Sequence, residues 1–304
     1  ACFDHATFYL LAREESQVCG LLPLIYMKSR LFPRCLVSLP YFCNGGVVAD
    51  DKEIASTLLD EARSLMKSVG AELLLIRQQG DSLSELSCDT SKSTFHIKLD
   101  PDPDKVFGRF EKQVRRRIRK ASASGLHADW GTRFLPEFYE VYATNMRDLG
   151  IPIHSYDFYE AIVSTFRENT QILVVHLGDK AIAAQLLFTF KDRLLLVCAG
   201  SLREYLELCP NNLLYWEAVK YGCLKGYHIC DFGRSPKGSG PYQFKAQWSG
   251  EEIDCPTYYL DVDGRSLRRI QADNSRYHLG REIWKRLPLG ITTWLGRRIV
   301  RHLP

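Results

Sequence analysis

Strand patterns and helix patterns alternate along this chain, and the alternation restricts the fold more than any other feature. Apolar runs at residues 6–12 and 18–27 predict a hairpin, because a charged turn separates them. Residues 54–69 then repeat apolar side chains at helical spacing, and Leu73–Arg77 and residues 95–99 return to strand patterns. This order predicts helices packed on a mixed sheet, in an α/β or α+β fold.

The alternation starts again after the breaker Asp100–Pro103. The periodicity predicts, in chain order, helices at 104–124, 135–149 and 155–168, strands at 170–176, 181–190 and 193–199, a helix at 211–225 and a strand at 227–232. Because 304 residues exceed the usual size of one core, we expect two domains, at residues 1–100 and 101–264. A basic helical tail is expected at residues 265–304.

Composition narrows the class of function. The net charge of +4 suits anionic partners without the strong bias of a dedicated nucleic-acid binder. Ten cysteines are scattered without a Cys-x-x-Cys pair, so we expect reduced thiols in a cytoplasmic protein, with neither a disulfide scaffold nor a metal site. We expect no membrane span and no signal peptide, since the sequence shows neither pattern.

The segment Asp231–Trp248 follows the last predicted strand and is rich in glycine, proline, cations and aromatic residues. Glycines let a backbone approach a ligand closely, prolines stiffen the segment, and Arg234 and Lys237 supply positive charge. Loops at strand ends of α/β sheets commonly bind ligands, so we interpret the segment as an anion cradle, with a plain surface turn as the alternative. Its glycine spacing matches neither a nucleotide P-loop nor a dinucleotide-binding motif.

Two basic segments are candidates for polyanion contacts. Residues 112–120 carry six cations on a predicted helix, where Arg115, Arg116 and Arg119 are candidates for binding phosphate or RNA. A solvated helix face is the alternative interpretation. The tail mixes aromatic and basic residues over 274–304, so it either lies on the anionic inner face of a membrane or packs back on the domain.

Seven motifs are distributed over most of the chain, between residues 36 and 245. They are Leu36–Pro40, Lys112–Ala121, Pro152–Ser155, Gly200–Tyr205, Pro210–Glu217, Asp231–Ser235 and Gly240–Lys245. In order and spacing they closely resemble the FemAB-like family of the GNAT acyltransferase superfamily, and in particular its branch associated with PEP-CTERM and exopolysaccharide gene clusters. The resemblance implies tandem GNAT-like domains, the first incomplete. It also implies two splayed strands that bind an acyl donor, which by order are residues 181–190 and 193–199.

The reaction that the resemblance implies is attack of an amine on an ester or thioester. The donor is then aminoacyl-tRNA or acyl-CoA, used as a co-substrate rather than as a tightly bound cofactor, and the acceptor is a nucleotide- or lipid-linked sugar or peptide. The phosphate-binding signature of CoA-dependent GNAT enzymes is missing between Ala199 and Asn212, which argues against acetyl-CoA. A CoA-dependent N-acetyltransferase, a non-catalytic GNAT-like binding module and an RNA-binding protein are the alternatives.

The family's motifs also imply roles for individual residues. Lys245 and Phe244 match the family's Phe-Lys pair near the catalytic centre, where a cation stabilises a developing oxyanion. Asp231 is the third catalytic candidate. The candidates for substrate or donor binding are Arg203, Tyr205, Arg234, Lys237 and Tyr242, with Tyr41 and Asp50 in an acceptor groove of the first domain.

Overall fold

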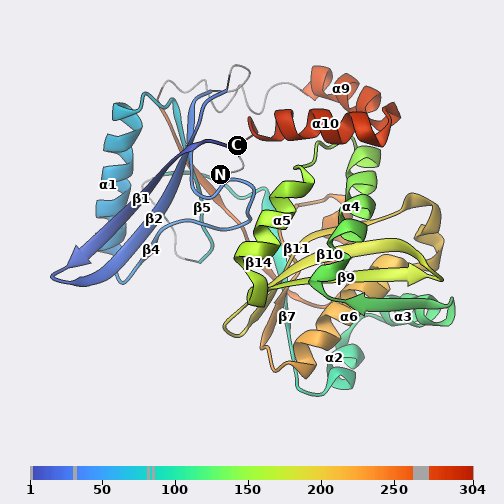
Figure 1. The fold of residues 1–304 in the computed structure, drawn as a ribbon. Coiled ribbons are helices and arrows are strands. Elements are labelled where there is room, and N and C mark those ends of the chain that lie inside the picture. Colours follow the sequence, from blue (N-terminus) through green and yellow to red (C-terminus); the bar gives the residue numbers. More distant parts are fainter. Residues whose placement is uncertain (1–2, 30–32, 81–82, 84–85, 263–273, 304) are drawn as a thin grey trace. The chain divides into compact units, whose positions relative to one another are not determined.

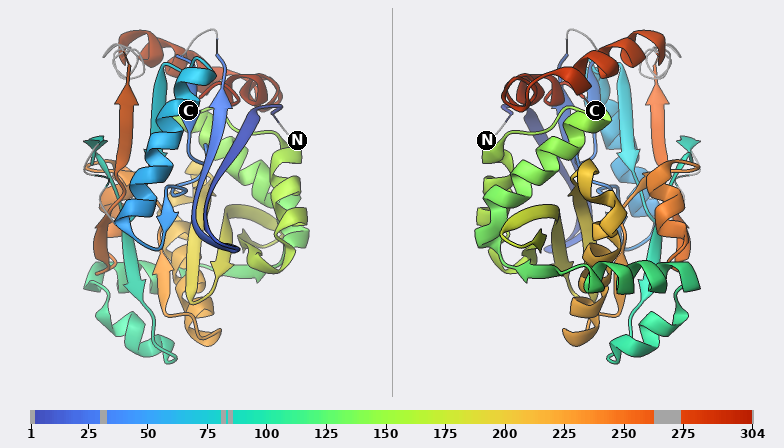
Figure 2. Two further views of the ribbon diagram at one scale, coloured as in Figure 1. Left: turned by 90° about the vertical axis from the view of Figure 1, so that its left-hand side faces the viewer. Right: turned by 90° about the vertical axis from the view of Figure 1, so that its right-hand side faces the viewer.

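The computed structural model describes residues 3–29, 33–80, 83, 86–262 and 274–303. The chain forms two compact units, which Figures 1 and 2 show from three directions. The first unit comprises residues 1–93, 254–278 and 301–304, and the second comprises residues 94–253 and 279–300.

A sheet of seven strands, counted over the described residues, forms the first unit. Its spatial order is β1 (Ala6–Glu14), β2 (Gln17–Met27), β3 (Cys35–Val37), β5 (Leu73–Arg77), β15 (Thr257–Asp261) and β6 (Ser87–Asp89), with β4 (Val48–Ala49) beside β2. Helix α1 (Lys52–Ser68) begins after Asp51, whose side chain accepts a hydrogen bond from the backbone N–H of Ile54. Leu58 and Met66 on one face of α1 join the apolar core of this sheet.

The second unit is built on a sheet of eight strands in the part of the chain that the structure describes. Its spatial order is β13 (Ser235–Pro236), β7 (Lys92–Lys98), β12 (Ile229–Asp231), β11 (Arg193–Ser201), β10 (Lys180–Phe190), β9 (Thr170–Leu177) and β8 (Leu126–Trp130), with β14 (Glu251–Asp254) beside β7. Its helices include α2 (Pro103–Arg109), α3 (Lys112–Ala123), α4 (Leu135–Leu149), α5 (Tyr156–Thr165), α6 (Pro210–Leu224) and α7 (Gly240–Ala246). Short 3₁₀ turns lie at η1 (Thr132–Phe134), η2 (Arg167–Asn169) and η3 (Arg203–Leu208).

Helices cover both faces of this second sheet. Successive side chains of β9 alternate between two cores, since Ile172 and Val174 pack with α4 and α5 while Leu173 and Val175 pack with α3 and α6. Figure 1 shows the two pairs of helices on opposite sides of β9 and β10. A residue's position along a strand therefore decides which helical layer it meets.

The last helices, α9 (Asn274–Arg286) and α10 (Leu289–Val300), belong largely to the second unit. Arg281 donates a hydrogen bond to the carbonyl oxygen of Leu149 at 3.1 Å, and Leu289 packs against the core beneath α4. This part of the basic tail therefore packs back on the protein. The remainder of the expected tail, at residues 265–273, lies outside the described residues. No helix in the described ranges is long and apolar enough to cross a membrane.

The predicted fold class is confirmed, because both sheets mix parallel and antiparallel pairs and carry helices. The division of the chain is less simple than two contiguous stretches on either side of residue 100. Most of β7 lies in the second unit and β15 lies in the first, so each sheet takes a strand from beyond that boundary. A breaker in the sequence marks a local turn, whereas strand pairing joins segments that are far apart along the chain.

Candidate functional site

Two parallel strands part in the second unit. β11 and β12 pair over three positions, from Arg193 opposite Ile229 to Leu195 opposite Asp231, and β12 then ends while β11 continues. On its other side, β11 pairs with β10 and carries a bulge at Val197. Among the described strands, none pairs with the β12 side of β11 beyond Leu195. This free edge suits an extended group that adds alongside the strand.

The prediction that residues 181–190 and 193–199 form the splayed pair was wrong. These strands are antiparallel partners along their length, because the turn at 191–192 is short enough to make a hairpin. Parallel neighbours need a long crossover, and α6 supplies it between β11 and β12. The strands that part are therefore β11 and β12.

Gly233 carries the chain away from β12. Its φ is +74°, in the left-handed region that glycine adopts without strain. A Cβ atom at this position would lie 2.4 Å from the carbonyl oxygen of Leu196 on β11. The backbone thus passes directly across β11 at the point where the two strands part, and only glycine fits there.

Lys245 places its ammonium at the same point. It lies on α7, which begins after Ser239, whose hydroxyl accepts a hydrogen bond from the N–H of Tyr242. The Lys245 residue is only 6% exposed, and its Nζ donates to the carbonyl oxygen of Gly233 at 2.8 Å and to Ser235 Oγ at 2.9 Å. The structure therefore holds a buried cation beside the parting of β11 and β12.

Asp231 fixes the turn that precedes Gly233. Its carboxylate accepts hydrogen bonds from the hydroxyl of Thr94 and, at 2.8 Å, from the N–H of Gly233, and it lies 3.3 Å from His96 Nε2. Burial alone would raise the pKa of Asp231, but the hydrogen bonds from His96, Thr94 and Gly233 outweigh burial and lower this pKa. The carboxylate is thus held ionised, and these contacts indicate a positioning role.

The other aromatic members of the motif pack around α7. Phe244 is half-buried, and its ring centroid lies 5.0 Å from that of Tyr215 and 5.9 Å from that of Trp248. The hydroxyl of Tyr242 donates to Glu252 at 3.0 Å. Phe244 and Tyr242 are both half-buried against the core, and they anchor α7 next to Lys245. The cations Arg234 and Lys237 lie on the segment between Gly233 and α7, half-buried and exposed respectively.

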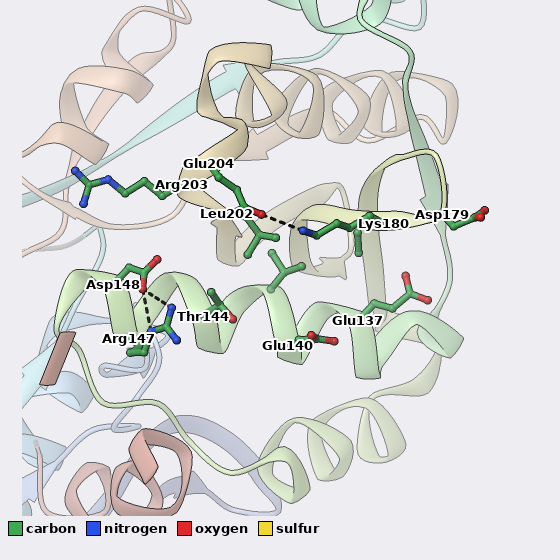
Figure 3. Close-up of a pocket in the computed structure, with 12 residues that line it drawn as sticks. Glu137, Glu140, Thr144, Arg147, Asp148, Asp179, Lys180, Leu202, Arg203 and Glu204 are labelled. Carbon is green, nitrogen blue, oxygen red and sulfur yellow. Dashed lines mark hydrogen bonds and ion pairs between the residues drawn. The ribbon is translucent and has the colours of Figure 1, made fainter. Parts of the chain in front are cut away.

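A cavity of about 700 Å³ lies between α4 and the end of β11. Its lining comes from α4, from the turn between β9 and β10, and from the start of η3, as Figure 3 shows. The lining residues are Glu137, Glu140, Val141, Thr144, Arg147, Asp148, Asp179, Lys180, Ala181, Leu202, Arg203 and Glu204. Five carboxylates and three cations make the lining acidic overall.

Two of the predicted binding residues lie at this cavity. Arg203 lines it, and the hydroxyl of Tyr205 accepts a hydrogen bond from Lys180 at 2.9 Å. Lys180 also pairs with Glu204 at 2.9 Å, and its hydrogen bonds with Tyr205 and Glu204 raise its pKa to about 12. Sequence reasoning did not find Lys180, because it lies in an ordinary hairpin turn and becomes part of the cavity only through strand pairing.

The basic helix α3 lies on the opposite face of the sheet from this cavity. Its buried residues join the core that α3 shares with α6, and Arg116 and Arg119 are exposed while Arg115 is half-buried. Arg119 lies over the ring of Phe107 at 5.4 Å. Arg117 donates to the side chain of Gln247 just after α7 at 3.1 Å. The structure thus separates Arg115, Arg116 and Arg119 from the cavity.

Tyr41 and Asp50 belong to the first unit. Tyr41 has a φ of +74°, and burial raises the pKa of its hydroxyl to about 12. Asp50 directly precedes the N-cap of α1, and its N–H donates to the carbonyl oxygen of Cys19 at 3.0 Å. Both residues lie on the segment that connects β3 with α1.

Comparison with known proteins supports a GNAT-type architecture. Residues 108–246 match the family model "Acetyltransferase (GNAT) domain". The chain is similar to the structure of FemX, with 16% identity, 87% of this chain and 90% of that chain covered, and a TM-score of 0.66. It is also similar to a domain named as the C-terminal part of a lysylphosphatidylglycerol synthetase from Agrobacterium fabrum, with 12% identity, 89% of each chain covered and a TM-score of 0.63.

A third similar structure is a tandem GNAT protein from the clavulanic acid biosynthesis pathway, with 10% identity, coverage of 84% of this chain and 83% of that chain, and a TM-score of 0.52. A search of the curated proteins found no match. These likenesses confirm the predicted tandem GNAT-like fold. The exopolysaccharide-associated branch stays a prediction.

Proposed function

We propose that this protein transfers an acyl or aminoacyl group from an activated ester or thioester to an amine of a cell-envelope or exopolysaccharide precursor. The observation that carries the proposal is the buried ammonium of Lys245 at the parting of β11 and β12. The GNAT domain match and the likeness to FemX support an acyl-transfer reaction on this fold.

The free edge of β11 supplies the place for the donor. An extended acyl chain alongside β11 would bring its carbonyl carbon near Leu196 and Gly233, within reach of the Lys245 ammonium. The acceptor reacts as the neutral amine, and when its nitrogen attacks this carbonyl, the carbonyl oxygen becomes an oxyanion that a fixed cation in a buried setting stabilises. Collapse of the intermediate forms the amide and breaks the ester or thioester bond, and the proton that the amine loses leaves with the released alcohol or thiol. The carbonyl oxygen of Gly233 and the hydroxyl of Ser235 hold the ammonium in place.

The acidic cavity beside α4 suits an acceptor that carries an amine. Its carboxylates would attract the ammonium form of the acceptor, and Arg203 and Lys180 would contact anionic groups of the same molecule or of the donor. Arg234 and Lys237 would bind donor or acceptor phosphate near α7. The family resemblance assigns Tyr41 and Asp50 to an acceptor groove of the first unit by itself, and Arg115, Arg116 and Arg119 would contact RNA if the donor is aminoacyl-tRNA.

Within this proposal the donor is one of two alternatives, aminoacyl-tRNA or acyl-CoA. The name of the Agrobacterium domain describes synthesis of an aminoacylated phospholipid, which favours aminoacyl-tRNA and an envelope acceptor. The GNAT acetyltransferase match favours acyl-CoA instead. Helix α10 packs on the protein but leaves Ile291 and Trp294 exposed, and contact of this outer face with the inner face of a membrane would bring the protein to a lipid-linked acceptor.

The test is to incubate the protein with labelled acyl-CoA or aminoacyl-tRNA pools and with lipid- or nucleotide-linked amino sugars, and to follow the label. We expect Lys245→Met to lower the transfer rate about 10²- to 10³-fold. Lys225→Met, at an exposed lysine after α6, is the matched control and keeps the rate. Donor binding without transfer by the native protein would indicate a binding module, and equal rates for the two variants would remove the role of Lys245.

A further inference from the structure

Two histidines and a carboxylate meet on the edge of the second sheet. His127 and Asp129 alternate along β8, and His176 on β9 lies directly opposite His127 in the strand register. Asp129 Oδ2 lies 3.0 Å from His176 Nδ1 and 3.6 Å from His127 Nε2. Among the residues that the structure describes, these three form a group whose possible metal-ligand atoms all lie within 4.8 Å of one another.

The ring of His176 is fixed in one orientation. Its Nε2 lies 2.8 Å from the carboxylate of Glu137 on α4, and a carboxylate only accepts, so Nε2 carries the hydrogen. In the neutral ring, Nδ1 then presents a lone pair toward Asp129. His176 is 6% exposed, and its Nδ1 has no hydrogen-bond partner even though Asp129 Oδ2 is 3.0 Å away. Two acceptor atoms so close repel each other unless a proton or a metal ion lies between them, and the contact does not have the geometry of a hydrogen bond.

The charge around these three residues also favours a bound cation. Among the described residues, the carboxylate of Asp129 forms ion pairs with His127 and His176 and with no lysine or arginine. Two carboxylates, those of Asp129 and Glu137, therefore lie on either side of the His176 ring. A divalent cation would balance this charge.

We propose that His127, Asp129 and His176 bind a divalent first-row transition metal of the zinc class. Zinc bound to nitrogen and oxygen at about 2.0–2.2 Å separates tetrahedral ligands by about 3.4 Å, close to the 3.0 Å and 3.6 Å between Asp129 and the two histidines. Imidazole nitrogens with one carboxylate oxygen favour zinc-class metals over calcium or magnesium. Glu137 acts as the outer carboxylate that orients a metal-bound histidine.

The proposed metal site lies on a different strand edge from Lys245 and goes beyond the transferase proposal, although Glu137 also lines the acidic cavity. His127 has a side chain 55% exposed, so an ion can enter from solvent, and three protein ligands leave a fourth position for water. A bound ion would fasten the edge strand β8 to β9 and, through Glu137, to α4. The sequence search missed this group because its members are brought together by strand pairing and not by local spacing.

The test uses the full chain, stripped with a chelator and titrated with Zn²⁺ by calorimetry, and with Co²⁺ by visible absorption. We expect one equivalent to bind, with the Co²⁺ spectrum of a four-coordinate site. His127→Ala removes an exposed ligand without disturbing the core and should weaken binding at least tenfold. Glu137→Gln should weaken it about 10- to 100-fold. His228→Ala, at a histidine whose side chain is 78% exposed, is the matched control and keeps the native affinity.

Two results would overturn the proposal. The first is equal Zn²⁺ affinity in the native protein, His127→Ala and His228→Ala. The second is nitrogen NMR of His176 that shows both ring nitrogens protonated in the presence of Zn²⁺, since His176 would then be an imidazolium bridging Asp129 and Glu137. The thermal unfolding midpoint provides an independent readout, because a bound ion raises it in the native protein and not in His127→Ala.

Discussion

Gly233→Ala tests whether the close approach of the chain to β11 holds the candidate site together. An alanine Cβ would lie 2.4 Å from the carbonyl oxygen of Leu196, about 1 Å inside ordinary contact. The obstacle is a backbone atom of a central strand, so the turn at residue 233 must move rather than the neighbour. A shift of about 1 Å is enough to break the 2.8 Å hydrogen bond between Lys245 and the carbonyl of Gly233.

The expected cost has two parts. A non-glycine residue at a φ of +74° costs about 1–2 kcal/mol, and forcing atoms into a packed site costs about 1–3 kcal/mol more. Displacement of a catalytic group by about 1 Å lowers a rate about 10²-fold. We therefore expect Gly233→Ala to lose about 2–5 kcal/mol of unfolding free energy and about 10²-fold in transfer rate.

Gly238→Ala is the matched control, because Gly238 lies on the same segment with a φ of +76° and open space where a Cβ would be. It bears the cost of the left-handed backbone without the contact on β11. Urea unfolding and the labelled-transfer assay should separate the two variants. The reasoning is refuted if Gly233→Ala unfolds no more easily than Gly238→Ala and transfers at the same rate.

Three further substitutions test neighbouring features. Ser235→Ala removes one acceptor of the buried ammonium and should lower the transfer rate about tenfold, since a hydrogen bond to a charged group contributes about 1.5–3 kcal/mol; a rate equal to the native one counts against the arrangement. Asp231 has a folded-state pKa below its ordinary 3.8, so its stabilising effect is present above that pH and is lost as the pH falls below it; Asp231→Asn should flatten the dependence of unfolding free energy on pH in that acid range. Burial lowers the pKa of His154 from 6.5 to about 4, so the unfolded chain takes up a proton first as the pH falls. The native protein should lose about 2 kcal/mol between pH 7 and pH 5 through this group, and His154→Phe should not, in paired urea titrations.

Local pattern predicted most elements well because it depends on neighbours along the chain, but the single helix expected at 104–124 was wrong: Phe110 is extended and divides this stretch into α2 and α3. The helix at 211–225 matches α6 within a residue at each end, since Pro210 begins it and Gly226 follows it. The burial of Lys245 agrees with the role that its motif implied. That role itself stays a prediction until the variants are measured.

What the sequence could not show depends on pairing between distant segments. The splayed strands were misassigned because adjacency in sequence was used where a parallel pair requires a crossover. Lys180 and the group of His127, Asp129 and His176 become visible only when β8, β9 and β10 lie in register. No spacing rule along the chain joins residues that are about fifty positions apart.

The position of β15 in the first sheet bears on how the protein folds during synthesis. β15 lies between β5 and β6, although almost the whole second unit separates it from them in sequence. A ribosome would therefore release all of residues 94–253 before the first sheet could acquire its inner strand. The sheet that starts the chain is therefore completed only after β15 has been made, and a fragment cut at residue 100 would expose the unpaired edges of β5 and β6 to aggregation.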